Sequence, residues 1–164
     1  MNNAEIVQCV LDIKSWFSRG KGSRNIKDGA TSTDIQRLEK ALDSELPRVL
    51  KVLLGQVNGG IYFMDKEQLN SEAIMSMSSD LEGSRLWKRG LVPFCGDDNS
   101  MLAIDSRTDE VHEWDSDEGL GDVVAPNLLR YLEDYRNSLL TGHFEFLDEV
   151  GVVEKMGKAA ASRK

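Results

Sequence analysis

The sequence is poor in the side chains that carry most enzyme chemistry. Two cysteines and two histidines occur among its 164 residues. His112 and His143 stand in no recognisable arrangement with a serine or cysteine nucleophile, and no glycine-rich loop has the spacing of a phosphate-binding motif. We therefore expect no catalytic residue and no cofactor, and we prefer a function that works by binding.

Both cysteines lie in apolar sequence surroundings. Cys9 follows Val7-Gln8 and precedes Val10, and Cys95 follows Pro93-Phe94. Such contexts predict buried free thiols rather than a disulfide or a reactive nucleophile. Free thiols persist in a reducing compartment, so the sequence favours a cytoplasmic location.

Long apolar runs are also missing. No stretch reaches the roughly eighteen consecutive apolar residues that a membrane-spanning helix needs. The first residues lack the basic start and the apolar block of a secretory signal. We therefore expect neither membrane association nor export. The length suits one domain with a hydrophobic core.

Basic residues are scarce in the middle of the chain. The formal net charge is −8, but residues 31–150 carry 24 acidic and 11 basic side chains, whereas both ends are net basic. Between Pro93 and Asp122, ten carboxylates accompany one cation, Arg107. An acidic centre repels phosphate groups, which argues against a nucleic-acid partner and favours a protein with a basic surface.

Residues 33–63 contain the sequence signals of a complete folding unit. Thr33 and Gln36 have the spacing of a capping box at a helix start, and Pro47 suits the first position of a second helix. Asn58-Gly59-Gly60 then supplies residues that tolerate positive φ and end this helix, and Ile61–Phe63 restarts as a strand.

The ends differ from this centre in composition. Residues 1–20 predict an amphipathic helix, and residues 21–30 form a polar, glycine-containing linker. Residues 31–150 hold the remaining apolar periodicity and are predicted to form the domain. Residues 151–164 are predicted to be a flexible basic tail.

Three apolar runs predict neighbouring strands. Leu91–Cys95 contains Pro93, which favours an edge position. Met101–Ile104 is apolar throughout, as in a strand covered on both faces, and a short polar loop separates it from Val111–Trp114. These two runs therefore predict an antiparallel hairpin.

Helical signals lie before and after these strands. A helix is expected from Ser71, and Asn127 is expected to cap a final helix. Phe144, Phe146 and Leu147 predict that the chain then packs back as a short strand or turn. The fold class predicted is α+β, with a central, mainly antiparallel sheet of about four to six strands and helices packed on it.

Two features have competing interpretations. Residues 115–119 resemble the opening of a calcium loop, but a third alternating ligand is missing and Pro126 stands where the twelfth-position Glu belongs. We expect a solvated acidic loop there and no metal. Trp87, followed by Lys88-Arg89, could anchor a partner, but packing of the indole over the sheet edge is preferred.

An ordered set of short motifs resembles the SUKH superfamily. The motifs are Leu46-Pro47, Asn58-Gly59-Gly60, Leu91-Val92-Pro93-Phe94, Gly96-Asp97-Asp98, Met101 to Asp105 and Val111-His112-Glu113-Trp114-Asp115. The superfamily includes yeast cell-wall assembly regulators and bacterial toxin-immunity proteins. The resemblance covers residues 33–140 and implies a single α+β domain that functions by protein contact. The chain departs from the pattern at Asn99-Ser100-Met101 and Ser116-Asp117, so no particular partner is implied.

These observations lead to a hypothesis of an immunity-type protein that neutralises a toxin through an acidic surface. The expected partner-binding residues are Asp97, Asp98, Glu113, Trp114, Asp115, Asp117, Glu118 and Asp122. Two alternatives stay open. One is a regulatory scaffold of cell-wall assembly or signalling that uses the first helix and the basic tail. The other is a hydrolase or metal-dependent enzyme that uses the acidic loop.

Overall fold

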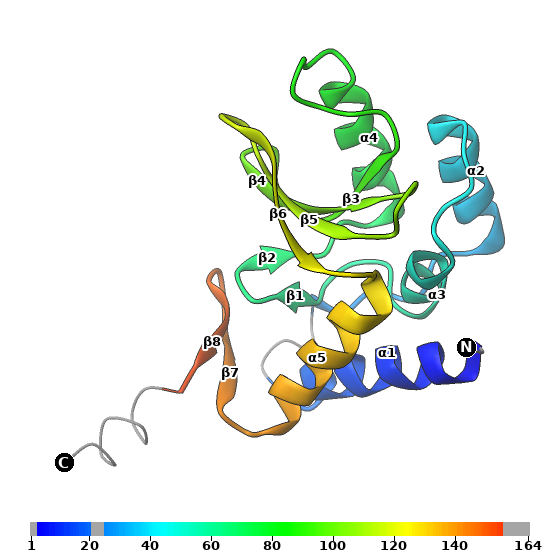
Figure 1. Cartoon of the computed structure of the whole chain (residues 1–164). Helices are drawn as coiled ribbons and strands as arrows, with labels where there is room; N and C mark the ends of the chain where they lie inside the picture. Colours follow the sequence, from blue (N-terminus) through cyan, green and yellow to red (C-terminus); the bar gives the residue numbers. More distant parts are fainter. Residues whose placement is uncertain (1–2, 21–24, 156–164) are drawn as a thin grey trace.

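The computed structural model describes residues 3–20 and 25–155, which fold as a single α+β domain (Figure 1). Its helices are α1 (Asn3–Ser18), α2 (Ser32–Leu42), α3 (Arg48–Gln56), α4 (Ser71–Leu81) and α5 (Leu128–Leu140). Its strands are β1 (Tyr62–Phe63), β2 (Lys66–Glu67), β3 (Leu91–Gly96), β4 (Ser100–Asp105), β5 (Val111–Asp115), β6 (Gly119–Ala125), β7 (Phe144–Leu147) and β8 (Gly151–Glu154). The predicted fold class is confirmed.

The main sheet contains β3, β4, β5 and β6 in that order, and every neighbouring pair is antiparallel. β3 lies at one edge, as Pro93 predicted, and the register between β3 and β4 shifts just after this proline. The β4–β5 hairpin predicted from the apolar runs is also confirmed. β4 is buried from Met101 to Asp105, as expected for a strand covered on both faces.

Two small hairpins, β1–β2 and β7–β8, form separate two-stranded sheets; β2 contacts β3, and β8 contacts β1. Gln68 forms a bridge with Cys95, and the Leu69 N–H donates to the Phe94 carbonyl at 2.9 Å, so the chain after β2 covers the β3 edge. The Val152 N–H in turn donates to the Met64 carbonyl at 2.9 Å. These contacts place the turns of the small hairpins near those of the main sheet.

Helices cover both faces of the main sheet (Figure 1). α1, α3 and α5 pack together against the larger core, whose sheet residues include Phe94, Ile104 and Val111. α4 packs on the opposite face, over a smaller cluster. This cluster contains Leu81, Leu91, Met101, Ala103 and Trp114.

The glycine stop after α3 is required by close packing. Gly60 has a φ of +103°, and a Cβ atom at this position would lie 1.7 Å from the Asn25 carbonyl oxygen. The buried amide of Gln68 accepts from the Gly59 N–H at 3.0 Å and donates to the Val57 carbonyl at 2.7 Å. These hydrogen bonds satisfy the buried backbone groups of the turn. A side chain on Gly60 would displace the turn and break them.

Residues 25–30 of the predicted linker are hydrogen-bonded to the rest of the domain. The Lys27 N–H donates to the Gly59 carbonyl at 3.0 Å, and the Ala30 N–H donates to the Leu54 carbonyl at 2.7 Å. This segment is therefore bonded to the end of α3 and to the glycine turn. Residues 21–24, the rest of the predicted linker, lie outside the described residues.

The predicted capping box is displaced by two residues. Thr31, not Thr33, caps α2: its hydroxyl accepts from the Asp34 N–H at 3.1 Å, and the Asp34 carboxylate accepts from the Thr31 N–H at 3.0 Å. These hydrogen bonds lower the pKa of Asp34 below its ordinary value. Both threonines offer a hydroxyl, but only Thr31 has a carboxylate three residues later. Pro47 likewise precedes α3 as its cap rather than opening it.

The predicted tail begins too early. Residues 151–154 form β8, which pairs with β7, because Gly151 packs where no side chain fits and Val152 is buried in the core. Residues 156–164 lie outside the described residues. The chain after α5 therefore packs back on the core, as the apolar residues of β7 predicted.

α5 connects the core to the first hairpin. Asn127 caps it as predicted, with its side-chain oxygen accepting from the Arg130 N–H at 2.8 Å. The Tyr135 hydroxyl donates to the Tyr62 carbonyl at 2.6 Å and accepts from the Met64 N–H at 3.1 Å. This tyrosine fixes the β1–β2 turn relative to the rest of the molecule.

Candidate functional site: an acidic surface of hairpin turns

The β3–β4 and β5–β6 turns lie side by side. The Ser116 N–H donates to the Asn99 carbonyl at 3.0 Å, and Ser100 is opposite Asp115 in the β4–β5 register. Because antiparallel strands bring the start of β4 next to the end of β5, Asp97 and Asp98 are placed beside the 115–118 turn. This part of the predicted site is therefore contiguous.

The β3–β4 turn is shaped by its own aspartate. One oxygen of Asp97 accepts from the Asn99 N–H at 2.9 Å and from the Ser100 N–H at 3.0 Å. Gly96 precedes it with a φ of +109°, and a Cβ atom there would lie 2.4 Å from the Ser100 carbonyl oxygen. The local sequence thus builds a tight turn that leaves Asp97 and Asp98 exposed.

The β5–β6 turn repeats this arrangement. One oxygen of Asp115 accepts from the Asp117 N–H at 2.9 Å and from the Glu118 N–H at 2.6 Å, and Gly119 follows with a φ of +80°. The side chains of Asp117 and Glu118 are exposed. Asp115 therefore contributes to the turn geometry as well as to the negative charge.

A third group of carboxylates was missed by the sequence reasoning. The β1–β2 turn, the β3–β4 turn and the β7–β8 turn enclose a hollow of about 260 Å³. Its lining residues are Tyr62, Asp65, Lys66, Glu67, Gly96, Asp97, Ser100, Glu149 and Val150. The Lys66 ammonium lies 3.6 Å from the Asp65 carboxylate. Only tertiary contacts bring these turns together, so no local pattern could have grouped them.

The pKa of Tyr62 is affected by the negative charge around this hollow. Partial burial, together with the nearby carboxylates of Glu67 and Asp148, raises the pKa of its phenol above the ordinary value of 10.0. We call the following carboxylates the acidic hairpin surface: Asp65, Glu67, Asp97, Asp98, Asp115, Asp117, Glu118, Asp148 and Glu149.

The remaining predicted site residues divide into two groups. Glu113 on β5 and Asp122 on β6 are exposed and lie further along these strands from the turn. Trp114 is wrongly assigned to the partner-binding site, because its side chain is 2% exposed and its indole N–H donates to the Leu86 carbonyl at 3.4 Å. The Trp87 ring packs edge-on against Trp114 at 5.6 Å, so the packing interpretation of Trp87 is confirmed.

The side chains considered for catalysis are buried or contact neighbouring groups of the fold. Burial raises the pKa of the Cys9 thiol to about 11 and also raises the pKa of Cys95, so both thiols are protonated at neutral pH and are poor nucleophiles. The His112 ring lies 3.2 Å from the Gly121 carbonyl and 3.3 Å from the Glu110 carboxylate. Within residues 3–20 and 25–155, no group of His, Cys, Asp or Glu side chains is arranged to hold a metal ion.

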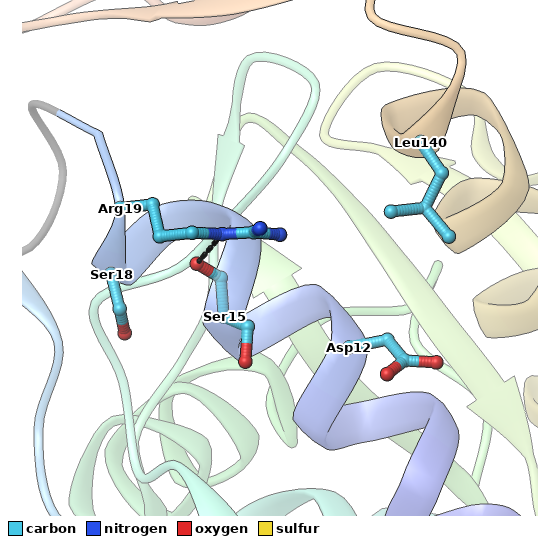
Figure 2. A pocket seen from close by; sticks show the side chains of 5 residues that line it. All are labelled: Asp12, Ser15, Ser18, Arg19 and Leu140. Carbon is cyan, nitrogen blue, oxygen red and sulfur yellow. Dashed lines mark hydrogen bonds between the residues drawn. The ribbon is translucent and has the colours of Figure 1, made fainter.

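A second depression, of about 400 Å³, lies between α1 and the end of α5 (Figure 2). Figure 2 shows Arg19 lying along α1, where its Nε donates to the Ser15 carbonyl at 3.3 Å. Asp12 accepts from the Gln8 amide at 2.8 Å and lies 3.8 Å from the Arg136 guanidinium. Because its charged groups are already engaged, we do not assign a ligand to this depression.

The sequence matches a protein-family model. The family SUKH_5, described as SMI1-KNR4 cell-wall, matches residues 10–137. The chain belongs to this family. The SUKH_5 match begins inside α1 and ends inside α5, so it starts well before residue 33, where the sequence resemblance began. No curated protein matches the sequence.

The SUKH_5 region contains most of the acidic hairpin surface. Asp65, Glu67 and the carboxylates of the β3–β4 and β5–β6 turns lie inside the match, whereas Asp148 and Glu149 follow it.

Within the parts of the chain that the structure describes, no helix combines the length and the apolar character needed to cross a bilayer.

Proposed function

We propose that this SUKH_5 protein is a non-catalytic binding module of the immunity type, which neutralises a toxin by holding its basic surface. The convergence of the hairpin turns into one acidic surface is the observation that supports this function. The buried free thiols of Cys9 and Cys95 are consistent with a cytoplasmic protein.

The geometry of the turns suits recognition of a folded partner. Asp97 and Asp115 each use one oxygen to fix their own turn, and Tyr135 fixes the β1–β2 turn from α5. Carboxylates on such pre-organised turns lose little conformational freedom when a partner binds. A basic partner would be attracted before contact, so association should be fast and should slow as salt is added.

The description of the family, which names the cell wall, favours a second candidate. This is a regulatory scaffold of cell-wall assembly or signalling. In the form considered from sequence, α1 and the basic tail would carry the contacts. However, the apolar side of α1 is already buried against α3 and α5, with Ile6, Val10 and Ile13 at most 1% exposed. The scaffold would therefore have to use another surface, and the acidic hairpin surface fits this role too.

A charge-reversal experiment distinguishes binding by the acidic hairpin surface from a general effect of net charge on binding. The variant Asp117→Lys with Glu118→Lys changes two exposed carboxylates of the β5–β6 turn. The matched control, Asp28→Lys with Glu45→Lys, makes the same change in net charge at exposed positions before and after α2. α2 lies on the opposite side of the molecule from the small hairpins (Figure 1).

The three proteins are immobilised, and captured proteins from the source organism are identified by mass spectrometry. We expect the wild type and the control to retain a basic partner that the turn variant loses, with similar melting temperatures for all three. Equal capture by the turn variant would contradict the role of the acidic surface.

The neighbouring reading frame decides between the two candidates. An immunity function predicts that the product of this frame arrests growth when expressed alone and that co-expression of this chain restores growth. Restoration should fail with the Asp117→Lys and Glu118→Lys variant. A neighbouring product that has no effect on growth would favour the regulatory scaffold.

A further inference from the structure

The two edges of the main sheet differ. The β3 edge is covered by Gln68 and Leu69, which bond to Cys95 and Phe94. β6 forms the other edge and pairs with β5. Among the residues that the structure describes, no further strand pairs with β6 on its outer side. An open strand edge presents backbone N–H and C=O groups that can pair with another chain.

The outer part of β6 combines exposure with β-forming side chains. Residues 121–124 are all exposed. The side chains of Val123 and Val124 are 48% and 39% exposed, although valine is usually buried. Val123 is opposite His112 in the register. His112 and Trp114 are two residues apart on β5 and so share a face of the sheet, which places Val123 on the face that carries Trp114. This apolar surface on an open edge favours the addition of a strand.

Apolar surface continues toward the start of β6. Leu120 is half-buried against the cluster around Trp114, and the exposed Leu86 packs beside Gly119. An incoming strand would therefore find apolar contacts along one side of its path. The register shifts of the β5–β6 pair limit regular pairing to a short run, so side chains must supply much of the selectivity.

The charges along this edge define the chemistry of the occupant. No lysine or arginine occurs between Arg107 and Arg130, and Glu113, Glu118 and Asp122 are exposed on β5, β6 and their turn. A second copy of this chain is disfavoured, because pairing two β6 edges would bring like charges together in a protein of net charge −8. An extended segment that carries cations is complementary.

We propose that the β6 edge accepts an extended segment of alternating basic and apolar residues, which pairs with β6 as an additional strand. This inference rests on the proposed function and specifies how the partner would be held. Backbone hydrogen bonds to residues 121–124 supply part of the affinity. Cations of the segment meet Glu118 and Asp122, and its apolar side chains lie beside Val123 and Val124.

The test uses the full-length protein and a synthetic peptide of alternating lysine and valine with blocked ends. The control peptide has the same lysines with proline in place of valine, so it keeps the charge but cannot pair as a strand. Backbone amides are followed by hydrogen–deuterium exchange and by NMR. We expect the lysine–valine peptide, but not the control, to slow exchange at residues 121–124.

Variants of β6 test the backbone directly. Val123→Pro and Val124→Pro each remove one N–H of β6, and the variant that keeps the wild-type melting temperature has lost an outward N–H and kept the ladder with β5. We expect that variant to bind the lysine–valine peptide about tenfold more weakly. Val123→Thr and Val124→Thr keep the N–H and the branched shape, and they should bind within about twofold of the wild type.

Three outcomes would overturn the inference. Binding of both peptides with shifts only at the acidic turns would show that charge alone holds the segment, and the proposed function would survive. Slow exchange at β6 that depends on protein concentration without peptide would assign the edge to a second copy. Binding of neither peptide would contradict the inference, while a partner retained by the wild type and the control but lost by the turn variant in the charge-reversal experiment would still support the proposed function.

Discussion

The N–H of Ser116 donates a hydrogen bond to the carbonyl of Asn99 at 3.0 Å, and this contact joins the two turns that carry most of the predicted acidic residues. It places Asp97 and Asp98 in one surface with Asp117 and Glu118, although nearly twenty residues separate the two pairs in the sequence.

Asp115 should matter more for stability than its neighbours in the turn. Asp115→Ala removes the acceptor for two backbone N–H groups, so we expect the free energy of unfolding to fall by about 1–2 kcal/mol. Asp115→Asn keeps an acceptor oxygen and should cost less than about 1 kcal/mol. Urea denaturation measures both. Equal losses for the two variants would mean that charge, not the turn bond, is responsible.

Trp114 should behave as a core residue. Its burial and its contact with Trp87 predict that Trp114→Ala lowers the free energy of unfolding by about 3–5 kcal/mol. Trp114→Phe keeps an aromatic ring and should cost distinctly less. Thermal unfolding, followed by circular dichroism, provides the comparison. A Trp114→Ala protein that keeps its stability but loses partner capture would restore the original assignment of this residue.

Gly60 should not tolerate a side chain. Gly60→Ala combines a positive φ with a clash against the Asn25 carbonyl, so we expect a loss of more than about 3 kcal/mol or failure to fold. Gly83→Ala is the control, because a Cβ atom there has nothing within 4 Å, and it should change stability by less than about 1 kcal/mol. Soluble yield and melting temperature report the difference; similar values for the two variants would refute the packing argument.

Acid should remove a stabilising contribution from Asp105. Hydrogen bonds from the Arg107 guanidinium and N–H hold the pKa of this carboxylate below its ordinary value of 3.8. Because the folded pKa lies below the unfolded one, the contribution is complete above the unfolded pKa and is lost as the pH falls through the folded pKa.

Asp105→Asn isolates this effect from the other carboxylates. At neutral pH we expect the variant to be less stable than the wild type by about 1 kcal/mol. The difference should shrink as the pH is lowered through about 4 and then below the folded pKa. Denaturation curves at several pH values measure it. A difference that does not depend on pH would show that the ionised form of Asp105 is not the stabilising one.

Both thiols should resist modification in the folded protein. Cys9 and Cys95 are 1% and 0% exposed, and burial raises the pKa of each. We expect a thiol reagent to label neither residue at neutral pH within the time that labels both after denaturation. Mass spectrometry gives the count. Rapid labelling of either cysteine in the native protein would show that the core around α1 or β3 opens readily.

Much of the fold follows from local chemistry in the sequence. The glycine turn after α3, the edge position of Pro93 and the Asn127 cap each depend on a residue whose backbone or side chain has few alternatives. The start of α2 was displaced because two threonines compete for the cap. The polar composition of residues 25–30 did not reveal their backbone hydrogen bonds to residues that are distant in sequence.

The candidate site was predicted in part. Charge density in the sequence indicated the carboxylates of the β3–β4 and β5–β6 turns. Asp65, Glu67, Asp148 and Glu149 could not be added, since their turns meet the others only through the packing of the small hairpins on β3 and α5. Trp114 was misassigned because it lies between Glu113 and Asp115 in the sequence, whereas α4 and the chain around Trp87 cover the side of β5 that carries the indole.

The packing of α1 bears on how shortened forms of the protein would behave. The family match begins at Val10, whereas Ile6 and Cys9 are already in the core and Asn3 accepts a hydrogen bond from Arg48 at 2.8 Å. A fragment trimmed to the matched region would start half a helix late and leave an open seam between α3 and α5. Such a fragment would expose apolar side chains to water and precipitate. Its insolubility would say nothing about partner recognition.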